Sequence, residues 1–194
     1  MYDVSVDKLR KELDLIPEQI GNESFLNGSG LGNEIPFWIF HYPAEHELFV
    51  RSYFPYIEKS LSNYTFKHLN IFQVLIDLLD ERKLLDRIEA QEKRVGHQKL
   101  KERLSAPLSQ DKIARFIESN VKIDQLDFML ISGLGAAWPL LRGHELLSAL
   151  QDIMRATPLV LFYPGDYDGR ALSPFGMVES NNYYRAFSLN PSDS

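Results

Sequence analysis

The sequence predicts an α/β domain in which a mostly parallel sheet carries helices on both faces. Three apolar runs, at residues 35–40, 128–131 and 159–163, are short and bounded by turn residues, which is typical of strands buried on both sides. Segments with helical spacing of apolar residues separate these runs, and two parallel strands need such a crossover between them. We therefore expect a Rossmann-like sheet, or one like a P-loop nucleoside triphosphatase without its Walker motifs. The 194 residues suit one such domain.

The N-terminal part, residues 1–34, is expected to form a helix followed by a loop. Ser5 is a suitable helix cap, and Pro17 is expected to end the helix. Apolar residues recur at helical spacing between them: Val6, Leu9 and Leu13. Residues 21–33 hold four glycines and three asparagines, which favour turns, so we expect a surface loop there.

A helix and a strand are expected after the first apolar run. The helix covers residues 45–61, and Pro55 is expected to kink it or split it in two. Residues 66–71 form the next predicted strand, with Leu69 and Ile71 on one face.

The next segment is predicted to be a long helix with a break. Its first apolar stripe comprises Val74, Leu75, Leu78 and Leu79. Leu84, Leu85 and Ile88 are out of phase with that stripe, so we expect a break near residues 80–82. Residues 96–107 are polar and are interpreted as a connection.

Two more helices and a final strand complete the prediction. Ser109 is expected to cap a helix. The core-facing residues of that helix are Ile113, Phe116 and Ile117. In the other helix the apolar residues at helical spacing are Leu146, Leu147, Leu150, Ile153 and Met154. Residues 183–189 are expected to form a strand near an edge of the sheet, and residues 190–194 a polar tail.

The residue inventory excludes several classes of chemistry. Without any cysteine, the chain cannot form disulfides, thiolate metal sites or a cysteine nucleophile. Its N-terminus lacks the features of a signal peptide, and no apolar run reaches the ~20 residues of a membrane helix. We therefore expect a cytoplasmic protein without membrane contacts. The net charge of −6 argues against a broad basic surface, so direct DNA binding is expected to be weak or absent.

Charge is distributed unevenly along the chain. Residues 81–103 hold eight Lys/Arg against five Asp/Glu, a local +3, which leaves −9 for the rest of the chain. Two interpretations remain open: a solvated helix face with ion pairs, or a docking surface for an acidic partner or nucleic acid. The basic residues that a nucleic acid would meet are Lys93, Arg94, Lys99, Lys101 and Arg103.

In a parallel sheet, the loops after the carboxyl ends of the strands gather at one edge, where ligands usually bind. That edge is expected to contain residues 42–43, 133–135 and 164–169. A phosphate-binding loop needs glycines, a lysine and a hydroxyl group. The loop after the first strand has no glycine or lysine and carries Glu45 and Glu47, and the next buried run ends without an Asp for magnesium. We expect neither a nucleotide cofactor nor a metal.

Two glycines and two histidines at this edge permit weaker alternatives. Gly133 and Gly135 lack a third glycine at the dinucleotide spacing, because position 138 is Trp138, so a tight turn is the preferred interpretation. His41 and His46 with the neighbouring glutamates could form a metal site, but their spacing matches no recognised ligand geometry.

Two further clusters carry both a functional and a structural interpretation. His144 near Arg142 could form an acid–base pair with Asp166 and Asp168, or all four could form a hydrogen-bonded surface network. No Gly-x-Ser-x-Gly turn provides a serine nucleophile. Residues 181–187 combine tyrosines, amides and Arg185. They could form an interaction hot spot, or the tyrosines could cover the sheet while Arg185 pairs with Asp166 or Asp168.

Three strings in the last third of the chain are distinctive. They occupy residues 131–144, 157–169 and 182–187 and read ISGLGAAWPLLRGH, TPLVLFYPGDYDG and NYYRAF. In order and spacing they resemble the BrxB family of type 1 BREX bacteriophage-exclusion systems, whose activity is unknown. The first two thirds of the chain fit the length and helical pattern of that family.

The resemblance implies a bacterial or archaeal cytoplasmic protein that acts with other BREX proteins, namely the phosphatase-like PglZ, the ATPase BrxC and the methyltransferase PglX. It supplies no enzymatic residues, so our leading hypothesis is a non-catalytic assembly subunit that binds another BREX component such as PglZ. The alternative is a nucleotide- or nucleic-acid-binding protein with weak or no hydrolase activity. The residues expected at the partner surface are Trp138, Arg142, His144, Tyr163, Asp166, Tyr167, Asp168, Tyr183, Tyr184 and Arg185.

Overall fold

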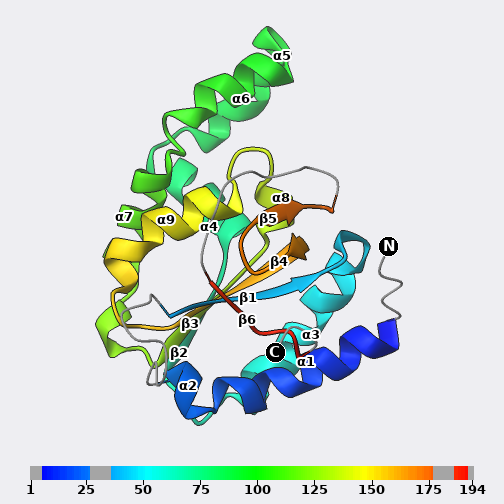
Figure 1. Ribbon diagram of the computed structural model, residues 1–194. Coiled ribbons are helices and arrows are strands. Elements are labelled where there is room, and N and C mark those ends of the chain that lie inside the picture. Colours follow the sequence, from blue (N-terminus) through cyan, green and yellow to red (C-terminus); the bar gives the residue numbers. More distant parts are fainter. Residues whose placement is uncertain (1–5, 27–35, 177–185, 192–194) are drawn as a thin grey trace.

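The computed structural model describes residues 6–26, 36–176 and 186–191, and a mostly parallel sheet lies at its centre (Figure 1). The strands are β1 Phe37–Tyr42, β2 Phe66–Asn70, β3 Phe128–Ser132, β4 Leu159–Tyr167, β5 Leu172–Pro174 and β6 Phe187–Ser188. Their order across the sheet is β2-β3-β4-β1-β6, with every neighbour parallel, and β5 pairs antiparallel with β4. The predicted α/β class is confirmed.

Helices cover both faces of the sheet. On one face lie α1 Val6–Ile20, α2 Glu23–Leu26 and α3 Glu47–Ser60, and on the other α4 Ile71–Glu81, α7 Gln110–Asn120 and α9 Gly143–Met154. Along β1, Phe37 and Ile39 join the core under α4, α7 and α9, whereas Phe40 and Tyr42 join the core under α1 and α3. Burying one such side chain contributes about 1.5–3 kcal/mol. The prediction that the central strands are buried on both sides is confirmed.

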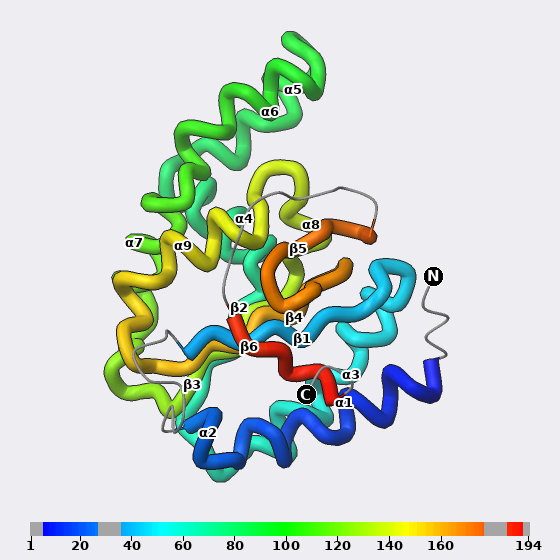
Figure 2. Tube along the Cα trace, viewed as in Figure 1, coloured from blue at the N-terminus to red at the C-terminus, as the bar shows by residue number. Residues whose placement is uncertain are grey.

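The break predicted near residues 80–82 is present, because α4 ends at Glu81, but the connection predicted at residues 96–107 is wrong. Following α4, the chain forms η2 Leu85–Arg87, α5 Ile88–Val95 and α6 His97–Ser105. Residues 85–105 form a helical arm that projects from the body of the molecule (Figures 1 and 2). The polar composition of residues 96–107 reflects an exposed helix, in which only Leu100 is buried and Leu104 is half-buried. A helix with so narrow an apolar side resembles a loop in composition.

Two prolines are accommodated inside helices. Pro17 lies within α1 and Pro55 within α3, so the first helix does not end at Pro17 and the second is not split at Pro55. Proline removes one backbone hydrogen bond from a helix and is unfavourable there. Buried residues flank each one: Ile16 and Ile20 in α1, and Phe54 and Ile57 in α3. Their burial holds both helices together, as tertiary packing often does.

Several predicted boundaries differ from the observed ones. Strand β2 ends at Asn70, and Ile71 begins α4 instead of sharing a strand face with Leu69. The Asn70 side chain causes this, because its Oδ1 accepts hydrogen bonds from the backbone N–H groups of Phe72 and Gln73 at 3.1 and 3.2 Å. Ser109 occupies the N-cap position of α7, as predicted, but its side chain makes no capping bond.

The loop predicted at residues 164–169 is mostly strand. β4 continues to Tyr167 and turns back into β5, so that Gly165 pairs with Pro174 and Tyr167 with Leu172. The prediction of a loop is therefore wrong for residues 164–167, because Gly165 lies within the antiparallel pairing of β4 and β5. The short element α8 Leu134–Ala137 follows β3.

Two predictions at the chain's irregular segments lie partly outside the described residues. In the predicted loop, residues 23–26 form α2, and residues 27–33 are not described. Of the predicted final strand, Phe187 and Ser188 form β6 beside β1 (Figure 2), and residues 183–185 are not described. The proposed cap Ser5 is also outside the described range. The remaining short helices are η1 Ala44–His46 and η3 Ile123–Gln125.

Within the described ranges, no helix is both long and apolar enough to span a membrane.

Candidate functional site

The segments that follow β1, β2, β3 and β4 pack tightly together at one edge of the sheet. A Cβ placed on Gly133 would lie 2.3 Å from Oδ1 of Asn70, and one on Gly135 would lie 3.1 Å from Cγ of Pro164. Gly133 also has a φ of +79°, which favours glycine. The side chain of Asn70, which caps α4, therefore fills the space beside the turn after β3. This close packing supports the interpretation of the glycine pair as a tight turn.

Large apolar side chains are exposed on this edge. Leu48 in the first turn of α3 is 77% exposed, Trp138 after α8 is 42% exposed, and Phe72 in the first turn of α4 is 38% exposed. The ring of Phe175 contacts Trp138 edge-on, with ring centroids 5.4 Å apart. We call Leu48, Phe72 and Trp138, together with the strand ends beneath them, the docking edge. The sequence analysis identified Trp138 but missed Leu48 and Phe72.

A cleft of about 640 Å³ adjoins the docking edge. It lies where β1 and β4 end, and α1 and β6 supply its other walls. Its polar lining residues are Lys8, Glu12, His41, Asp166, Asp168, Ser188 and Asn190. Aromatic side chains of Tyr42, Tyr167 and Phe187 complete it. The cleft is thus open at the position where ligands usually bind in a parallel sheet.

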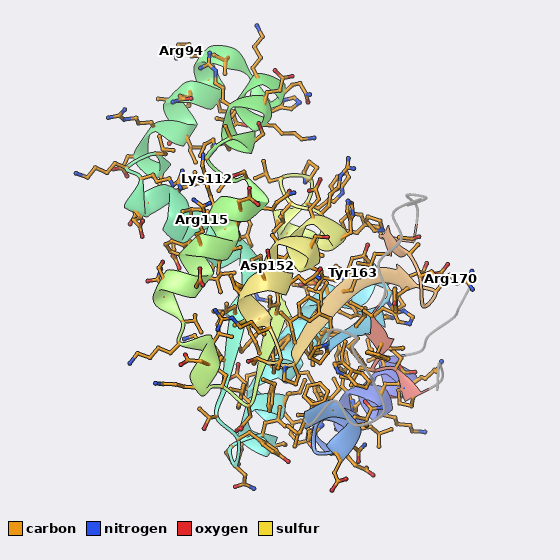
Figure 3. All side chains as sticks on the ribbon, turned by 60° about the vertical axis from the view of Figure 1, so that its left-hand side comes forward. Arg94, Lys112, Arg115, Asp152, Tyr163 and Arg170 are labelled. Carbon is orange, nitrogen blue, oxygen red and sulfur yellow. The ribbon has the colours of Figure 1, made fainter. Side chains whose placement is uncertain are left out.

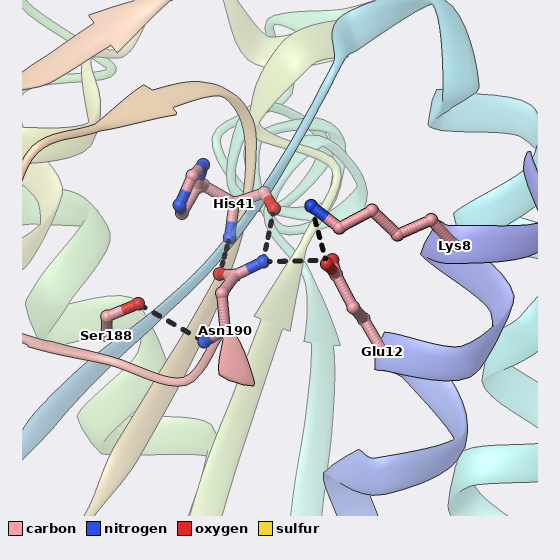
Figure 4. Close-up of polar contacts among 5 residues, drawn as sticks. All are labelled: Lys8, Glu12, His41, Ser188 and Asn190. Atoms are coloured by element: carbon pink, nitrogen blue, oxygen red, sulfur yellow. Dashed lines mark hydrogen bonds and ion pairs between the residues drawn. The ribbon is translucent and has the colours of Figure 1, made fainter. Parts of the chain in front are cut away.

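Asn190 closes one wall of this cleft by extending the sheet with its side chain (Figure 4). Its Oδ1 accepts from the backbone N–H of His41 at 2.9 Å, and its Nδ2 donates to the carbonyl of His41 at 2.9 Å. Nδ2 also approaches Glu12 at 3.4 Å, and Glu12 pairs with Lys8 at 3.4 Å. Asn190 is only 3% exposed. The amide therefore continues the β1–β6 pairing and joins it to α1.

Tyr167 fixes the C-terminal segment from the other side. Its hydroxyl donates to the carbonyl of Ala186 at 2.7 Å and accepts from the N–H of Ala186 at 3.0 Å. Both residues are buried. Asn190 and Tyr167 together hold β6 on the sheet, although this strand pairs with β1 over only two residues.

Burial and neighbouring carboxylates shift the pKa values of tyrosines at this edge. The hydroxyl of Tyr42 donates to Oε2 of Glu47 at 2.6 Å. Burial and the charge of Glu47 raise the pKa of Tyr42 well above its usual range. Burial, and then the charge of Asp166, raise the pKa of Tyr163. Both hydroxyls therefore stay protonated at neutral pH and act as structural groups.

The structure separates the predicted partner-surface residues into three groups. Trp138, Arg142, Asp166 and Asp168 are exposed, and His144 is half-buried. Tyr163 and Tyr167 are only 2% and 5% exposed, so they support the surface from below. Tyr183, Tyr184 and Arg185 lie outside the described residues. The expected pairing of Arg185 with either aspartate is therefore not described.

The carboxylate of Asp168 is committed to its own turn. Its Oδ1 accepts from the N–H groups of Arg170 at 2.8 Å and Ala171 at 2.7 Å. These bonds lower the pKa of Asp168. Burial lowers the pKa of His144, with Glu145 and Arg142 as its charged neighbours. The carboxylate of Asp168 therefore bonds within its own turn, and both interpretations of the cluster with His144 stay predictions. Within the described residues, no group of three or more histidine or acidic side chains is placed to hold a metal ion.

A hydrogen-bonded chain that the sequence did not suggest links α3, β2 and β3. Nδ1 of His68 lies 2.7 Å from Oε1 of Glu58, and its Nε2 lies 2.8 Å from Oγ of Ser132. The His68 ring also stacks on Phe54, with centroids 4.1 Å apart. Ser132 is only 6% exposed, so its hydroxyl is enclosed. The order acid, imidazole and hydroxyl resembles a catalytic triad, but the hydroxyl is covered. We call these three residues a tie, because they join α3 to the ends of β2 and β3.

The basic residues singled out from the sequence all lie on the helical arm. Lys93 and Arg94 end α5, and Lys99, Lys101 and Arg103 lie on α6. Figure 3 shows Arg94 at the far end of the arm. Lys93 pairs with Glu89 one turn earlier, at 2.5 Å. The arm and the docking edge are thus two different surfaces.

The fold and this edge define a class of α/β protein in which the strand ends expose apolar side chains and carry no phosphate-binding loop. Comparison with known proteins gives the family. The model of the BREX protein BrxB family matches residues 67–189. The chain therefore belongs to the BrxB family, and the resemblance seen in its last third is confirmed over a longer stretch.

Two relatives extend the similarity to nearly the whole chain. A BREX protein BrxB of Escherichia coli O9:H4 (strain HS) is 50% identical over 184 residues, which cover 94% of this chain and 92% of that protein. A BREX protein BrxB of Bacillus cereus (strain H3081.97) is 32% identical over 189 residues, which cover 94% of this chain and 97% of that protein. No solved structure matches the chain.

Proposed function

We propose that this protein is a non-catalytic assembly subunit of a BREX anti-phage defence complex and that it binds another BREX protein through the docking edge. PglZ is the first candidate, and the ATPase BrxC and the methyltransferase PglX are the others. The observation that carries the proposal is the exposure of Leu48, Phe72 and Trp138 on the three segments that follow β1, β2 and β3 at the carboxyl edge of the sheet.

Exposed apolar groups of this size are unfavourable unless a partner covers them. Each Å² of apolar surface removed from water contributes about 25 cal/mol, and exposed apolar patches commonly mark interaction sites. Tryptophan in particular is enriched among the residues that dominate binding energy at interfaces. Arg142 adds a charged group beside Trp138. An apolar centre with a polar rim is the usual anatomy of a protein interface.

The groups that might perform catalysis have structural partners instead. The hydroxyl of Ser132 is enclosed, the carboxylate of Asp168 caps its own turn, and Glu47 accepts the hydrogen bond of Tyr42. A hydrolase would need such groups to face a substrate. Their engagement supports a role in assembly.

Co-expression with the other BREX proteins, followed by size exclusion, tests the proposal. The wild-type chain is expected to comigrate with one of them, PglZ first. Leu48→Ser combined with Trp138→Ser should abolish comigration, since loss of two central apolar contacts costs about 2 kcal/mol or more each. The matched control is Leu15→Ser with Tyr56→Ser, which removes two apolar side chains that are 40% and 48% exposed elsewhere and should leave comigration unchanged.

Two outcomes would contradict the proposal. If the wild-type chain comigrates with no BREX protein, the assembly role fails. If both double variants lose the partner equally, the docking edge is not the interface. Comigration with BrxC or PglX in place of PglZ would identify a different partner, and the docking edge would remain the proposed interface.

A further inference from the structure

The helical arm carries a concentration of positive charge that the rest of the molecule does not share. Residues 93–103 hold five Lys/Arg against one Asp/Glu, a local +4, which leaves −10 for the remainder of the chain. Arg94, Lys99, Lys101 and Arg103 are all exposed. Within the part of the chain that the structure describes, none of these four forms an ion pair, and only Lys93 is paired, with Glu89. Their charges are therefore available to a ligand.

The packing of α6 leaves Lys99 and Arg103 away from the body. Leu100 is buried and Leu104 half-buried, which fixes the side of α6 that faces inward. Lys99 and Arg103 are four residues apart, so they lie one above the other on a different side of the helix. Lys101 faces a hollow between α6 and the segment at Pro139, so it lies on the body side of the arm.

The arm lacks the apolar anchors of a protein interface. Among the described residues, every large apolar side chain that is strongly exposed lies outside residues 85–105. Protein interfaces depend on aromatic and apolar hot spots, as the docking edge provides. Nucleic acids are bound chiefly by Lys and Arg contacts to phosphates, which need no such anchors. The chemistry of the arm thus fits a polyphosphate backbone better than an acidic protein surface.

The acidic remainder of the chain does not cancel this site. An α-helix of nine residues, such as α6, is roughly 13 Å long, whereas the Debye length is about 10 Å at 0.1 M salt. Salt therefore screens the distal end of the arm from much of the acidic body. The acidic body would also repel nucleic acid and so leave the arm as the point of contact.

We infer that the helical arm is a nucleic-acid contact that binds the phosphate backbone of a DNA duplex without reading its sequence. Binding by the isolated chain is expected to be weak and to depend steeply on salt. The arm and the docking edge are formed by different elements, although the hollow beside Lys101 reaches Pro139, the residue that follows Trp138.

Fluorescence anisotropy with a labelled 20-base-pair duplex, between 20 and 200 mM salt, tests the inference. Phosphate contacts by the four unpaired cations predict that log K falls against log salt with a slope of roughly −3.6. The variant Arg94→Gln, Lys99→Gln, Lys101→Gln, Arg103→Gln should reduce that slope by about 3.6 and weaken binding at least tenfold at 20 mM salt. Glutamine keeps a similar helix propensity, and circular dichroism should confirm that the helices persist.

The matched control removes four exposed cations from the body: Lys11→Gln, Arg51→Gln, Lys59→Gln, Lys122→Gln. This variant should bind the duplex as the wild type does. The inference is overturned if the wild type does not bind at 20 mM salt or if both variants weaken binding equally. It is also overturned if poly-L-glutamate displaces the duplex as well as unlabelled DNA does, because the site would then fit an acidic protein.

Discussion

The docking edge and the helical arm present opposite kinds of surface on one fold. At the edge, polar groups are tied to the backbone and apolar groups are exposed: Asn190 pairs with His41, while Leu48 and Trp138 face solvent. On the arm, apolar groups are mostly covered, and of the basic residues 93–103 only Lys93 forms an ion pair with another described residue. The edge therefore has a fixed shape suited to a protein, and the arm has a charge suited to a polyanion. The same type of substitution should therefore lower the free energy of unfolding by different amounts at the docking edge and on the arm.

Two glycines with a positive φ give the largest contrast. Gly133 at the edge has φ +79° and ψ +14°, in the left-handed helical region, whereas Gly96 on the arm has φ +78° and ψ +161°, in an extended region that is nearly exclusive to glycine. A Cβ on Gly133 would meet Asn70 at 2.3 Å, whereas one on Gly96 would meet nothing within 4 Å. Gly133→Ala should cost about 3 kcal/mol, from left-handed strain of about 1–2 kcal/mol and a disturbed cap of about 1 kcal/mol. Gly96→Ala should cost only the backbone strain of its own glycine-specific conformation.

Urea unfolding of both glycine variants measures the difference. The free energy of unfolding should fall further for Gly133→Ala than for Gly96→Ala, because only the alanine at position 133 would also collide with the Asn70 cap. Equal losses would mean that the edge is no more tightly packed than the arm.

A pair of asparagines gives the next largest effect. Asn190→Ala leaves the backbone N–H and C=O of His41 without their partner in a half-buried place, which should cost about 1–2 kcal/mol. Asn120→Ala removes a hydrogen bond to the carbonyl of Phe116 at an exposed helix end and should cost less than about 0.5 kcal/mol. Thermal unfolding of the two variants checks this order. Similar melting temperatures would show that Asn190 does not anchor β6.

The contrast also explains how much the sequence could predict. The central strands were predictable because burial on both faces requires continuous apolar runs, as at Phe128–Ser132. The arm was partly missed because a helix that buries little, such as α6, has the composition of a loop. Pro17 and Pro55 were misread because packing on both sides of a proline is a tertiary property.

The candidate site was predictable in position and less so in its residues. The sequence placed the edge through strand ends and turns, and it identified Trp138 and the basic residues of the arm. Leu48 and Phe72 were missed because an apolar residue in the first turn of a helix looks like part of its core. The tie between Glu58, His68 and Ser132 joins residues up to 74 positions apart in the chain, and no local pattern reveals it.

The smallest predicted effect concerns the pH dependence of stability at the edge. Burial lowers the pKa of His68 below its usual value, although Glu58 opposes the shift. Near pH 7 neither the folded nor the unfolded chain binds a proton at this ring. As the pH falls below about 6.5, the unfolded chain takes up a proton that the folded chain resists. The free energy of unfolding should then fall by up to about 1.4 kcal/mol per pH unit, until the lowered pKa is reached.

The variant His68→Gln isolates this contribution, because it removes the titrating ring and leaves the other acidic and basic groups in place. Denaturant unfolding of both proteins should be measured between pH 7.5 and 5. The free energy of unfolding of the wild type should exceed that of the variant by less and less as the pH decreases. A constant difference between the two proteins across this range would mean that His68 takes up its proton as readily in the folded chain as in the unfolded one. The tie between α3 and the ends of β2 and β3 would then be open to solvent, and the edge less rigid than its contacts indicate.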